Sequence, residues 1–237
     1  MIASIHQPAY LPWMGYFDKI ARADVFVYMD NVQYQKGSFQ NRNKIRTKAG
    51  PIWLTVPVET SGKLFSTLLA DITLNNRVDW SAKHASALRM NYGKAPNFPA
   101  RWPEIETYYL SDWQRLSDLC WSMMQGFLRM LDIKTKVVKA SELTGCTGHK
   151  SELVYSICKA VGADCYISGS QGRDYLDMAA FRSGGIDVYF QQYQHPVYKQ
   201  QYVGFEPFMG IVDALFCDDD PARHFRGSHG IDGCLPA

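Results

Sequence analysis

The opening stretch of the chain constrains the fold more than any other part. It reads MIASIHQPAYLPWMGYFDKIARADVFVYMD, with a short apolar run at Ile2–Ile5 that Pro8 stops. A helix is predicted from Pro12, a residue favoured in the first turn, because apolar residues then recur at helical spacing up to Ile20. A second apolar run follows at Val25–Tyr28. So short a strand–helix–strand unit indicates parallel strands in an α/β protein.

The same alternation of strand and helix returns in the second half of the chain. We predict strands at Lys136–Val138, Cys165–Ile167 and Ile186–Phe190, with a helix from a cap at Thr147 to Val161 and a short helix carrying Met178 and Phe181. Ile211–Phe216 is predicted to form a terminal helix. The fold class is therefore α/β, with a Rossmann-like, mostly parallel sheet and helices on both faces.

Between these halves lie a β-hairpin extension and an inserted helical block. Runs at Gln40–Lys48 and Ile52–Val58 flank a turn and predict the hairpin, followed by a loop at Ser61–Lys63 and a further strand at Thr67–Leu74. Within the block, we expect a helix at Trp80–Tyr92, a rigid connector or short helical turns around Pro96, Pro99 and Pro103, and a long helix opened by a capping box at Ser111–Gln114.

We expect one α/β domain over residues 1–237. It divides into a first α/β part at about 1–74, the helical insertion at 75–131, a second α/β part at 132–217 and a tail at 218–237 with little to pack. Hydrophobic content of 46% supports a core, and charged content of 20% argues against disorder. The net charge of +2 means that any anion site is local.

Cysteine and hydropathy patterns bear on metals and location. The six cysteines show neither a CxxC pair nor zinc spacing, so we expect reduced thiols and no metal. No segment approaches the ~20 apolar residues of a membrane span, and the sequence starts directly with a strand, so we expect a cytoplasmic protein without a membrane span. Four histidines are expected at the surface, namely His84, His149, His224 and His229.

Three loops should converge on the carboxyl edge of a parallel sheet, where ligands of such sheets bind. His6 and Asp30 end the first two strands, and His195 lies in the loop after the last one. We predict these three as catalytic residues, with His6 as a base that Asp30 orients. A hydrogen-bonded structural role is the alternative for both histidines. The predicted substrate- or phosphate-binding residues are Gln7, Tyr10, Trp13, Lys36, Asn41, Arg42, Lys44, Ser168, Gly169, Ser170, Gly172, Arg173, Asp174 and Tyr198.

Two patterns suggest binding of an anion. Alternation places Arg42, Lys44, Arg46 and Lys48 on one face of the first hairpin strand, either as a wall for phosphate or as a solvated edge strand. The loop SGSQGRDY after a predicted strand lets backbone N–H groups approach a phosphate, although it lacks the Gly-Lys-Ser/Thr of a P-loop, and a plain tight turn is the alternative. Arg173 needs an anionic partner, either Asp174 or a phosphate.

The motif HQPAYLPWMGYFDKI at His6–Ile20 resembles the opening signature of the WbqC-like family. The resemblance continues through NRNKI, WLTVPV, YISG and GRDYL, and so covers most of the chain. It implies a role in the assembly of O-antigen or other surface polysaccharides. The edge also resembles adenylyl-transferring enzymes with a His-x-Gly-His loop, but Tyr16 stands where the second histidine would fall, and no Lys-Met-Ser-Lys-Ser loop is present.

Together, these patterns favour an enzyme that transfers an acyl or aminoacyl group to the amine of a nucleotide-linked amino sugar or a similar small molecule. Arg42, Lys44 and Arg173 would hold the diphosphate, and N–H groups of Ser168–Gly172 would serve an oxyanion. ATP, a CoA thioester or aminoacyl-tRNA are candidate donors. The alternatives are a nucleotide- or RNA-binding module and an ATP-dependent amide-forming ligase. Glycosyl transfer ranks lower without an Asp-x-Asp motif. Exposed tryptophans at Trp102, Trp113 and Trp121 would suit a homodimer.

Overall fold

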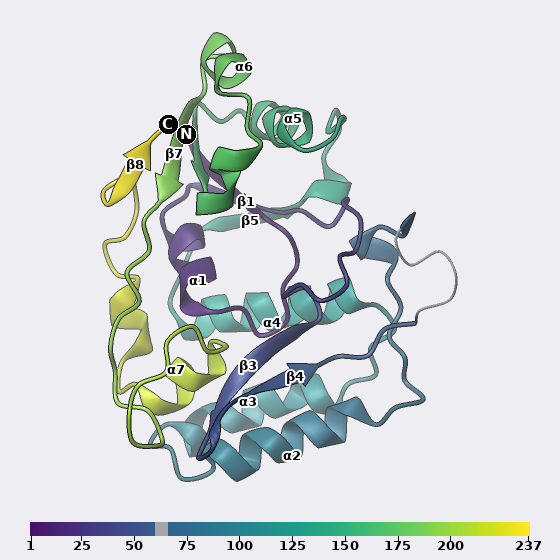
Figure 1. The fold of residues 1–237 in the computed structure, drawn as a ribbon, viewed down its shortest axis with the longest axis vertical. Helices are drawn as coiled ribbons and strands as arrows, with labels where there is room; N and C mark the ends of the chain where they lie inside the picture. The colour runs from purple at the N-terminus through teal and green to yellow at the C-terminus, as the bar shows by residue number, and fades with distance from the viewer. Residues whose placement is uncertain (60–65) are drawn as a thin grey trace.

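The protein is built around one six-stranded sheet with the strand order β5-β2-β1-β6-β7-β8 (Figure 1). The structure is a computed structural model that describes residues 1–59 and 66–237. The strands are β1 Ile2–His6, β2 Val25–Tyr28, β5 Lys136–Lys139, β6 Cys165–Ser168, β7 Asp187–Gln191 and β8 Cys234–Pro236. All neighbouring strands are parallel except β8, which pairs antiparallel with β7. The loop expected at Ser61–Lys63 lies outside the described residues.

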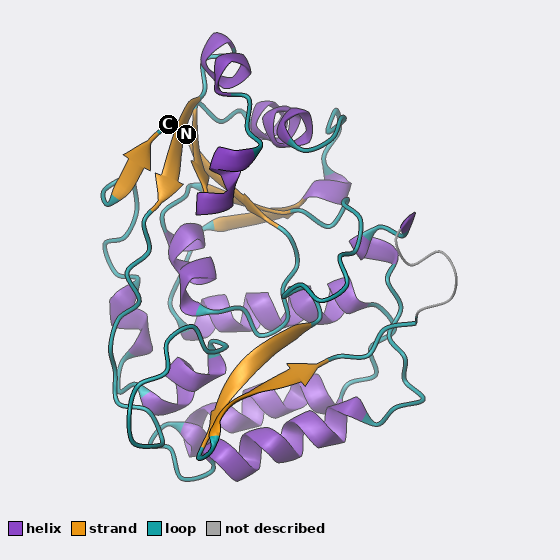
Figure 2. Cartoon of the chain, in the orientation of Figure 1, coloured by secondary structure: helices purple, strands orange, loops and turns teal. Residues whose placement is uncertain are grey.

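Helices cover both faces of this sheet (Figure 2). α1 (Met14–Ala21) and α4 (Leu116–Met130) share one apolar cluster with Phe26 and Tyr28 of β2, whereas α5 (Ser151–Val161) and α6 (Met178–Ser183) share another with Val25 and Val27. Alternate residues of one strand thus face opposite layers. The predicted Rossmann-like α/β class is confirmed.

A second layer lies beside α4 and holds the hairpin and the helical block (Figure 1). β3 (Arg42–Thr47) and β4 (Gly50–Thr55) form the predicted antiparallel hairpin, and α2 spans the predicted Trp80–Tyr92 with Asp79 as its cap. α7 (Val212–Cys217) packs against α3 and completes this layer. That the whole chain folds as one domain stays a prediction.

The proline-rich connector was predicted wrongly, because α3 is a helix of 13 residues at Phe98–Leu110. Pro99 lies in its first turn, where a missing N–H is harmless, but Pro103 lies inside it. Trp102 (7% exposed) and Ile105 (0%) are buried on the inner face, and this burial offsets the lost hydrogen bond. Because Trp102 is buried and the other two tryptophans of the expected dimer surface are partly buried against the core, they do not form an exposed patch.

Helix starts were the other main errors. α4 begins after Arg115, and Ser111 instead ends α3, where its hydroxyl donates to the Thr107 carbonyl. α5 begins after Lys150, because Thr147 exchanges hydrogen bonds with Ser156 instead of capping the helix. The strand expected at Thr67–Leu74 is a 3₁₀ turn at Leu69–Asp71 flanked by single bridges.

The tail packs more than expected. β8 extends the sheet, and Phe225 is 6% exposed in the core. The two termini lie side by side at one end of the molecule (Figure 1). No helix in the described part of the chain is long and apolar enough to cross a membrane.

The strand order places β1 between β2 and β6, so the chain reverses its direction of progress across the sheet at β1. Such a switch point opens a crevice at the carboxyl ends of the strands. The β1–β2 ladder runs to His6 and Tyr28, whereas the β1–β6 ladder ends earlier, at Ser4 and Ile167. β1 therefore separates from β6 after Ser4, shortly before His6 and the loop that follows it.

Candidate functional site

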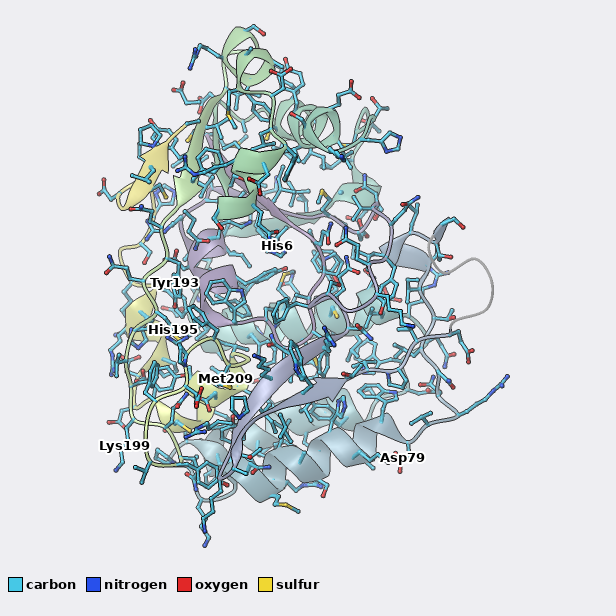
Figure 3. The ribbon with its side chains drawn as sticks, viewed as in Figure 1. His6, Asp79, Tyr193, His195, Lys199 and Met209 are labelled. Atoms are coloured by element: carbon cyan, nitrogen blue, oxygen red, sulfur yellow. The ribbon has the colours of Figure 1, made fainter. Side chains whose placement is uncertain are left out.

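His6 ends β1 at the switch point (Figure 3). Its Nδ1 lies 3.0 Å from the Gln7 carbonyl oxygen, which can only accept, so Nδ1 carries the hydrogen and Nε2 keeps its lone pair. The ring packs edge-on against Tyr16, with centroids 4.9 Å apart. Burial, with a smaller contribution from the charge of Lys19, lowers the pKa of His6 to about 3. His6 is therefore neutral at physiological pH, with Nε2 able to accept a hydrogen bond.

Asp30 does not orient His6. Its carboxylate accepts hydrogen bonds from the Ser141 amide (2.9 Å) and hydroxyl (2.7 Å). Ser141 lies in the 3₁₀ turn that follows β5, and Asp30 is 2% exposed. Asp30 thus ties the end of β2 to the chain after β5, and His6 takes its orientation from the Gln7 carbonyl instead.

The loop after β6 is a compact 3₁₀ turn at Ser170–Asp174. The Gly172 amide donates to the Gly169 carbonyl at 3.0 Å, so this N–H is already used. Ser168 is 2% exposed. Arg173, Asp174 and Ser170 are exposed. The Arg173 guanidinium lies 4.1 Å from the Phe190 ring centroid and has no carboxylate partner in the described part of the chain.

Gly172 is required by a close approach. A Cβ there would lie 2.1 Å from Ser168 Oγ, whereas one at Gly169 would meet nothing within 4 Å. We expect Gly172→Ala to destabilise the protein by about 1–3 kcal/mol, lowering Tm by about 2–12 °C. Gly169→Ala, at a φ of −72°, is the matched control and should leave Tm nearly unchanged. Equal melting temperatures for the two variants in calorimetry would contradict this close packing.

The hairpin presents a smaller cationic face than predicted. The Arg42 guanidinium and Lys44 Nζ lie 4.4 and 5.1 Å from the Trp53 ring centroid. Arg46 is instead buried (7% exposed), where it donates to the Val203 carbonyl at 3.0 Å and lies 3.7 Å from the Glu206 carboxylate. Lys48 belongs to the turn between the two strands. The face therefore consists of two cations on a half-exposed tryptophan.

The segment before the hairpin joins this face to the loop after β1. Gln40 Nε2 donates to Gln7 Oε1 at 2.6 Å, and the Tyr10 amide donates to the Phe39 carbonyl at 3.2 Å. Phe39 (52% exposed) packs against Trp53, with ring centroids 5.6 Å apart. We call Arg42, Lys44, Trp53 and Phe39 the hairpin platform. It is an extension of the switch-point edge, held there by backbone and amide contacts.

Several residues predicted to bind substrate have structural partners. The Tyr10 hydroxyl hydrogen-bonds to His84 Nδ1 (2.8 Å) and Tyr109 (3.0 Å) in the interior. His84 is thus buried (6% exposed), contrary to its expected surface position. Asn41 donates to the Val56 carbonyl at 2.8 Å. Lys36 is exposed in a turn.

His195 lies apart from His6, in an aromatic cluster of the loop after β7 (Figure 3). Tyr193, Phe205 and Phe208 lie within 5.8 Å of its ring, centroid to centroid, and Trp13 contacts Tyr193 and Phe208 in turn. The His195 Nδ1 bonds to the Pro196 carbonyl at 2.9 Å, and burial lowers the pKa of the ring. Trp13 precedes α1 and Tyr16 lies within it, so the two histidines flank the start of this helix.

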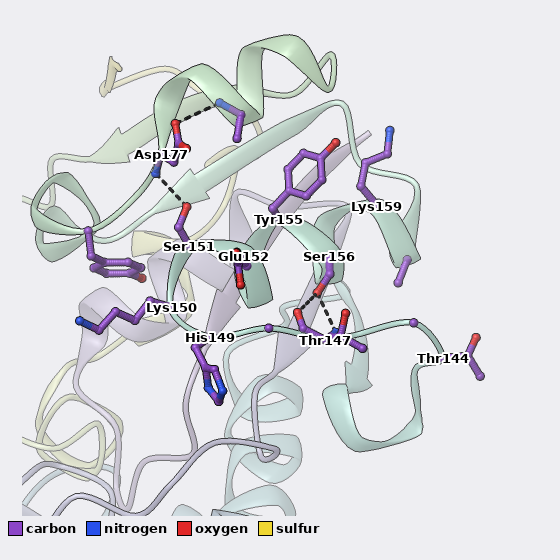
Figure 4. Close-up of a pocket in the computed structure, with 15 residues that line it drawn as sticks. Thr144, Thr147, His149, Lys150, Ser151, Glu152, Tyr155, Ser156, Lys159 and Asp177 are labelled. Atoms are coloured by element: carbon purple, nitrogen blue, oxygen red, sulfur yellow. Dashed lines mark hydrogen bonds between the residues drawn. The ribbon is translucent and has the colours of Figure 1, made fainter.

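A cavity of about 860 Å³ lies between α5 and α6, on the other face of the sheet from α1 (Figure 4). His149 and Lys150 line one end and Lys159 another, with Glu152 and Asp177 between them. The residues that line the cavity have balanced charges and do not include His6. Among the described residues, no group of three or more His, Cys, Asp and Glu side chains is arranged to hold a metal.

The fold is of the doubly wound α/β class, whose members commonly bind ligands at a strand switch point. The profile of the WbqC-like protein family matches residues 7–224, so the chain belongs to that family. It is 34% identical to the uncharacterized protein Rv1507c of Mycobacterium tuberculosis over 215 residues, which is 90% of this chain and 92% of the relative. No solved structure matches significantly.

Proposed function

We propose that this protein is an enzyme that transfers an acyl or aminoacyl group to the amine of a nucleotide-linked amino sugar or a similar small molecule. The observation that carries the proposal is the geometry of His6 at the switch point, with Nδ1 committed to Gln7 and Nε2 left as an acceptor. An amine nucleophile needs such an acceptor for its proton. A substrate phosphate bound near the ring would favour the imidazolium form and raise the pKa of His6 in the complex. Family membership adds surface-polysaccharide or specialised-metabolite assembly as the pathway class, and six free cysteines suit the reducing cytoplasm.

The steps assign each group a role. The substrate amine donates a hydrogen bond to His6 Nε2 and attacks the acyl carbonyl carbon. As the C–N bond forms, the nitrogen loses its proton to Nε2, and the carbonyl electrons move to oxygen. Collapse of this adduct expels the carrier, which takes the proton from Nε2. The exposed Arg173 and the partly exposed Arg42 and Lys44 of the hairpin platform supply cations for the substrate phosphates.

The hairpin platform specifically favours a second candidate, a module that binds RNA. An exposed aromatic ring beside two cations suits a stacked base and its phosphates. This candidate includes the case in which aminoacyl-tRNA is the donor. An ATP-dependent ligase would use the same phosphate-binding cations.

A thermal-shift screen against ATP, CoA thioesters, nucleotide-linked amino sugars and bulk tRNA, at low and moderate salt, tests the proposal. A small-molecule enzyme gains stability as RT ln(1 + [L]/Kd) from one nucleotide sugar or thioester, and the gain persists in salt. Product formation by mass spectrometry from the stabilising pair then completes the test. Stabilisation by tRNA alone that vanishes with salt would overturn the small-molecule transferase in favour of the RNA-binding module.

The hairpin platform yields a separate prediction. Arg42→Met and Lys44→Met should each weaken binding of the stabilising nucleotide sugar by roughly tenfold, because each removes a charge-assisted contact with phosphate. Lys48→Met, in the exposed turn of the same hairpin, is the matched control. Isothermal titration of the three variants would contradict the assignment if Lys48→Met lost as much affinity as the other two.

A further inference from the structure

Lys19 is a buried lysine of the His6–Ile20 motif to which the proposed reaction gives no role. Its side chain is 3% exposed, and Nζ donates to the Ile5 carbonyl at 2.8 Å. In the described part of the chain, no carboxylate lies within ion-pair distance of it. The adjacent Asp18 is committed elsewhere, to Arg22 Nε at 2.8 Å and Gln191 Nε2 at 2.6 Å. An ammonium group therefore sits in the interior with two of its three N–H groups unassigned.

The position of Lys19 is fixed at the switch point. Long helical side chains lean toward the helix N-terminus, which carries Lys19 from α1 back to the end of β1. The β1–β6 ladder stops at Ser4, and the next carbonyl, that of Ile5, is the one that Lys19 binds. The Ser4 hydroxyl donates to the Lys19 carbonyl at 3.1 Å and anchors its backbone. Lys19 thus lies where β1 and β6 part.

Burying a charge without a counter-ion is costly, and burial accordingly lowers the pKa of Lys19 to about 7. The titratable groups on the surrounding elements offer no compensating negative charge. His6 on β1 is neutral, and burial holds the pKa of both Tyr16 on α1 and Tyr28 on β2 well above its ordinary value. Asp18 on α1 is paired with Arg22. A ligand with a negative group would supply the missing partner.

We propose that Lys19 is the anion-binding residue of the switch-point site, where its ammonium pairs with a phosphate oxygen of a bound diphosphate. Because much of Lys19 is neutral above pH 7, binding takes one proton from solvent onto Nζ. The bound phosphate then lies near His6, whose pKa the charge of Lys19 helps to lower. The inference rests on the proposed function for the identity of the ligand as a diphosphate.

Titration calorimetry with UDP and ADP at pH 8 tests this, run in two buffers of different ionisation enthalpy to count protons. We expect the wild type to take up a fraction of a proton, at most one, with at least one of the two nucleotides, because burial lowers the pKa of free Lys19 and the bound phosphate raises it. Lys19→Met should lose that uptake and bind at least tenfold more weakly. Lys83→Met, an exposed lysine of α2, should match the wild type.

The proposal is overturned if neither nucleotide binds, if the wild type takes up no proton, or if Lys19→Met keeps the uptake and the affinity. Should Lys19→Met fail to fold, NMR of the wild type with ¹³Cε-labelled lysine replaces it. The Lys19 signal must then move from the neutral to the charged position on UDP or ADP addition, and an unmoved signal overturns the proposal. Proton uptake at Lys19 without turnover of any donor would refute the transferase alone, whereas turnover with unaltered Lys19→Met binding would refute the anion site alone.

Discussion

Replacing His6 by alanine should lower kcat/KM for amine acylation by about 10²- to 10⁴-fold, the range typical of a lost acid–base group. The reason is that the alanine variant lacks the Nε2 lone pair at the end of β1, while the strand itself is held by its ladder to β2. The ring makes one hydrogen bond and packs edge-on against Tyr16, so the loss of stability should stay near 1–2 kcal/mol. Steady-state kinetics and a urea melt measure the two effects separately.

The pH dependence sharpens this test. The folded-state pKa of His6, about 3, lies below its ordinary 6.5, so the native state binds fewer protons than the unfolded chain between these values. His6 should therefore contribute a fall in wild-type stability of up to about 1.4 kcal/mol per unit as pH drops from 6.5 toward 3, and His6→Ala should have a slope shallower by that amount, with the buried His84 still contributing. His149→Ala, at an exposed histidine, serves as the control. A His6→Ala variant with most of its transfer activity would refute the base.

Local sequence pattern was sufficient for the parallel strands of the sheet, but it missed β8 and failed where tertiary contacts decide. Apolar runs near the N-terminus predict β1 and β2, and those in the second half of the chain predict β6 and β7, because buried parallel strands are apolar on both faces. Pro103 predicts a break, yet α3 continues through it because Trp102 and Ile105 are buried beneath it. Ser111 is a residue type that commonly caps the start of a helix, yet here it ends α3. Local sequence alone does not distinguish a serine that starts a helix from one that ends it.

The candidate site shows the same division. The position of His6 at a strand end follows from its place before Pro8, but the partner of Asp30 does not, because Ser141 lies far along the chain. Lys19 has the sequence position of a solvent-facing residue of an amphipathic helix, and only the structure shows that it is buried with Nζ on the Ile5 carbonyl. Arg46 alternates with Arg42 and Lys44, yet the loop that carries Glu206 covers it. The sequence of one strand does not indicate that a segment distant in the chain will bury one of its side chains.

Asp213 is the second residue whose loss should have a large effect, in this case on folding. It is fully buried at the start of α7, where Oδ1 accepts a hydrogen bond from Tyr92 and Oδ2 accepts from Tyr198 and Gln200, each at 2.8 Å. The Tyr92 hydroxyl in turn accepts from the Arg46 amide at 2.8 Å. One carboxylate therefore joins α2, α7, the hairpin and the loop around Tyr198, which was predicted to bind substrate.

Asp213→Ala should destabilise the protein by about 3–5 kcal/mol, because it leaves three buried donors without an acceptor. The fall in Tm should be roughly 6–20 °C. Tyr198→Phe, which removes one donor and leaves the carboxylate satisfied by the others, is the matched control and should cost only about 1 kcal/mol. Equal urea midpoints for the two variants would contradict a shared network.

The sign of the pH effect gives an independent check on Asp213. Burial raises the pKa of this carboxyl group above its ordinary 3.8, so the native state holds the proton more tightly than the unfolded chain. The stability that the protonated group contributes is complete below 3.8 and is lost as pH rises through the raised value. The stability difference between wild type and Asp213→Ala should therefore be larger in acid than at neutral pH. A difference that instead grew toward neutral pH would show that the ionised carboxylate, rather than the acid, is the form that the three donors stabilise most.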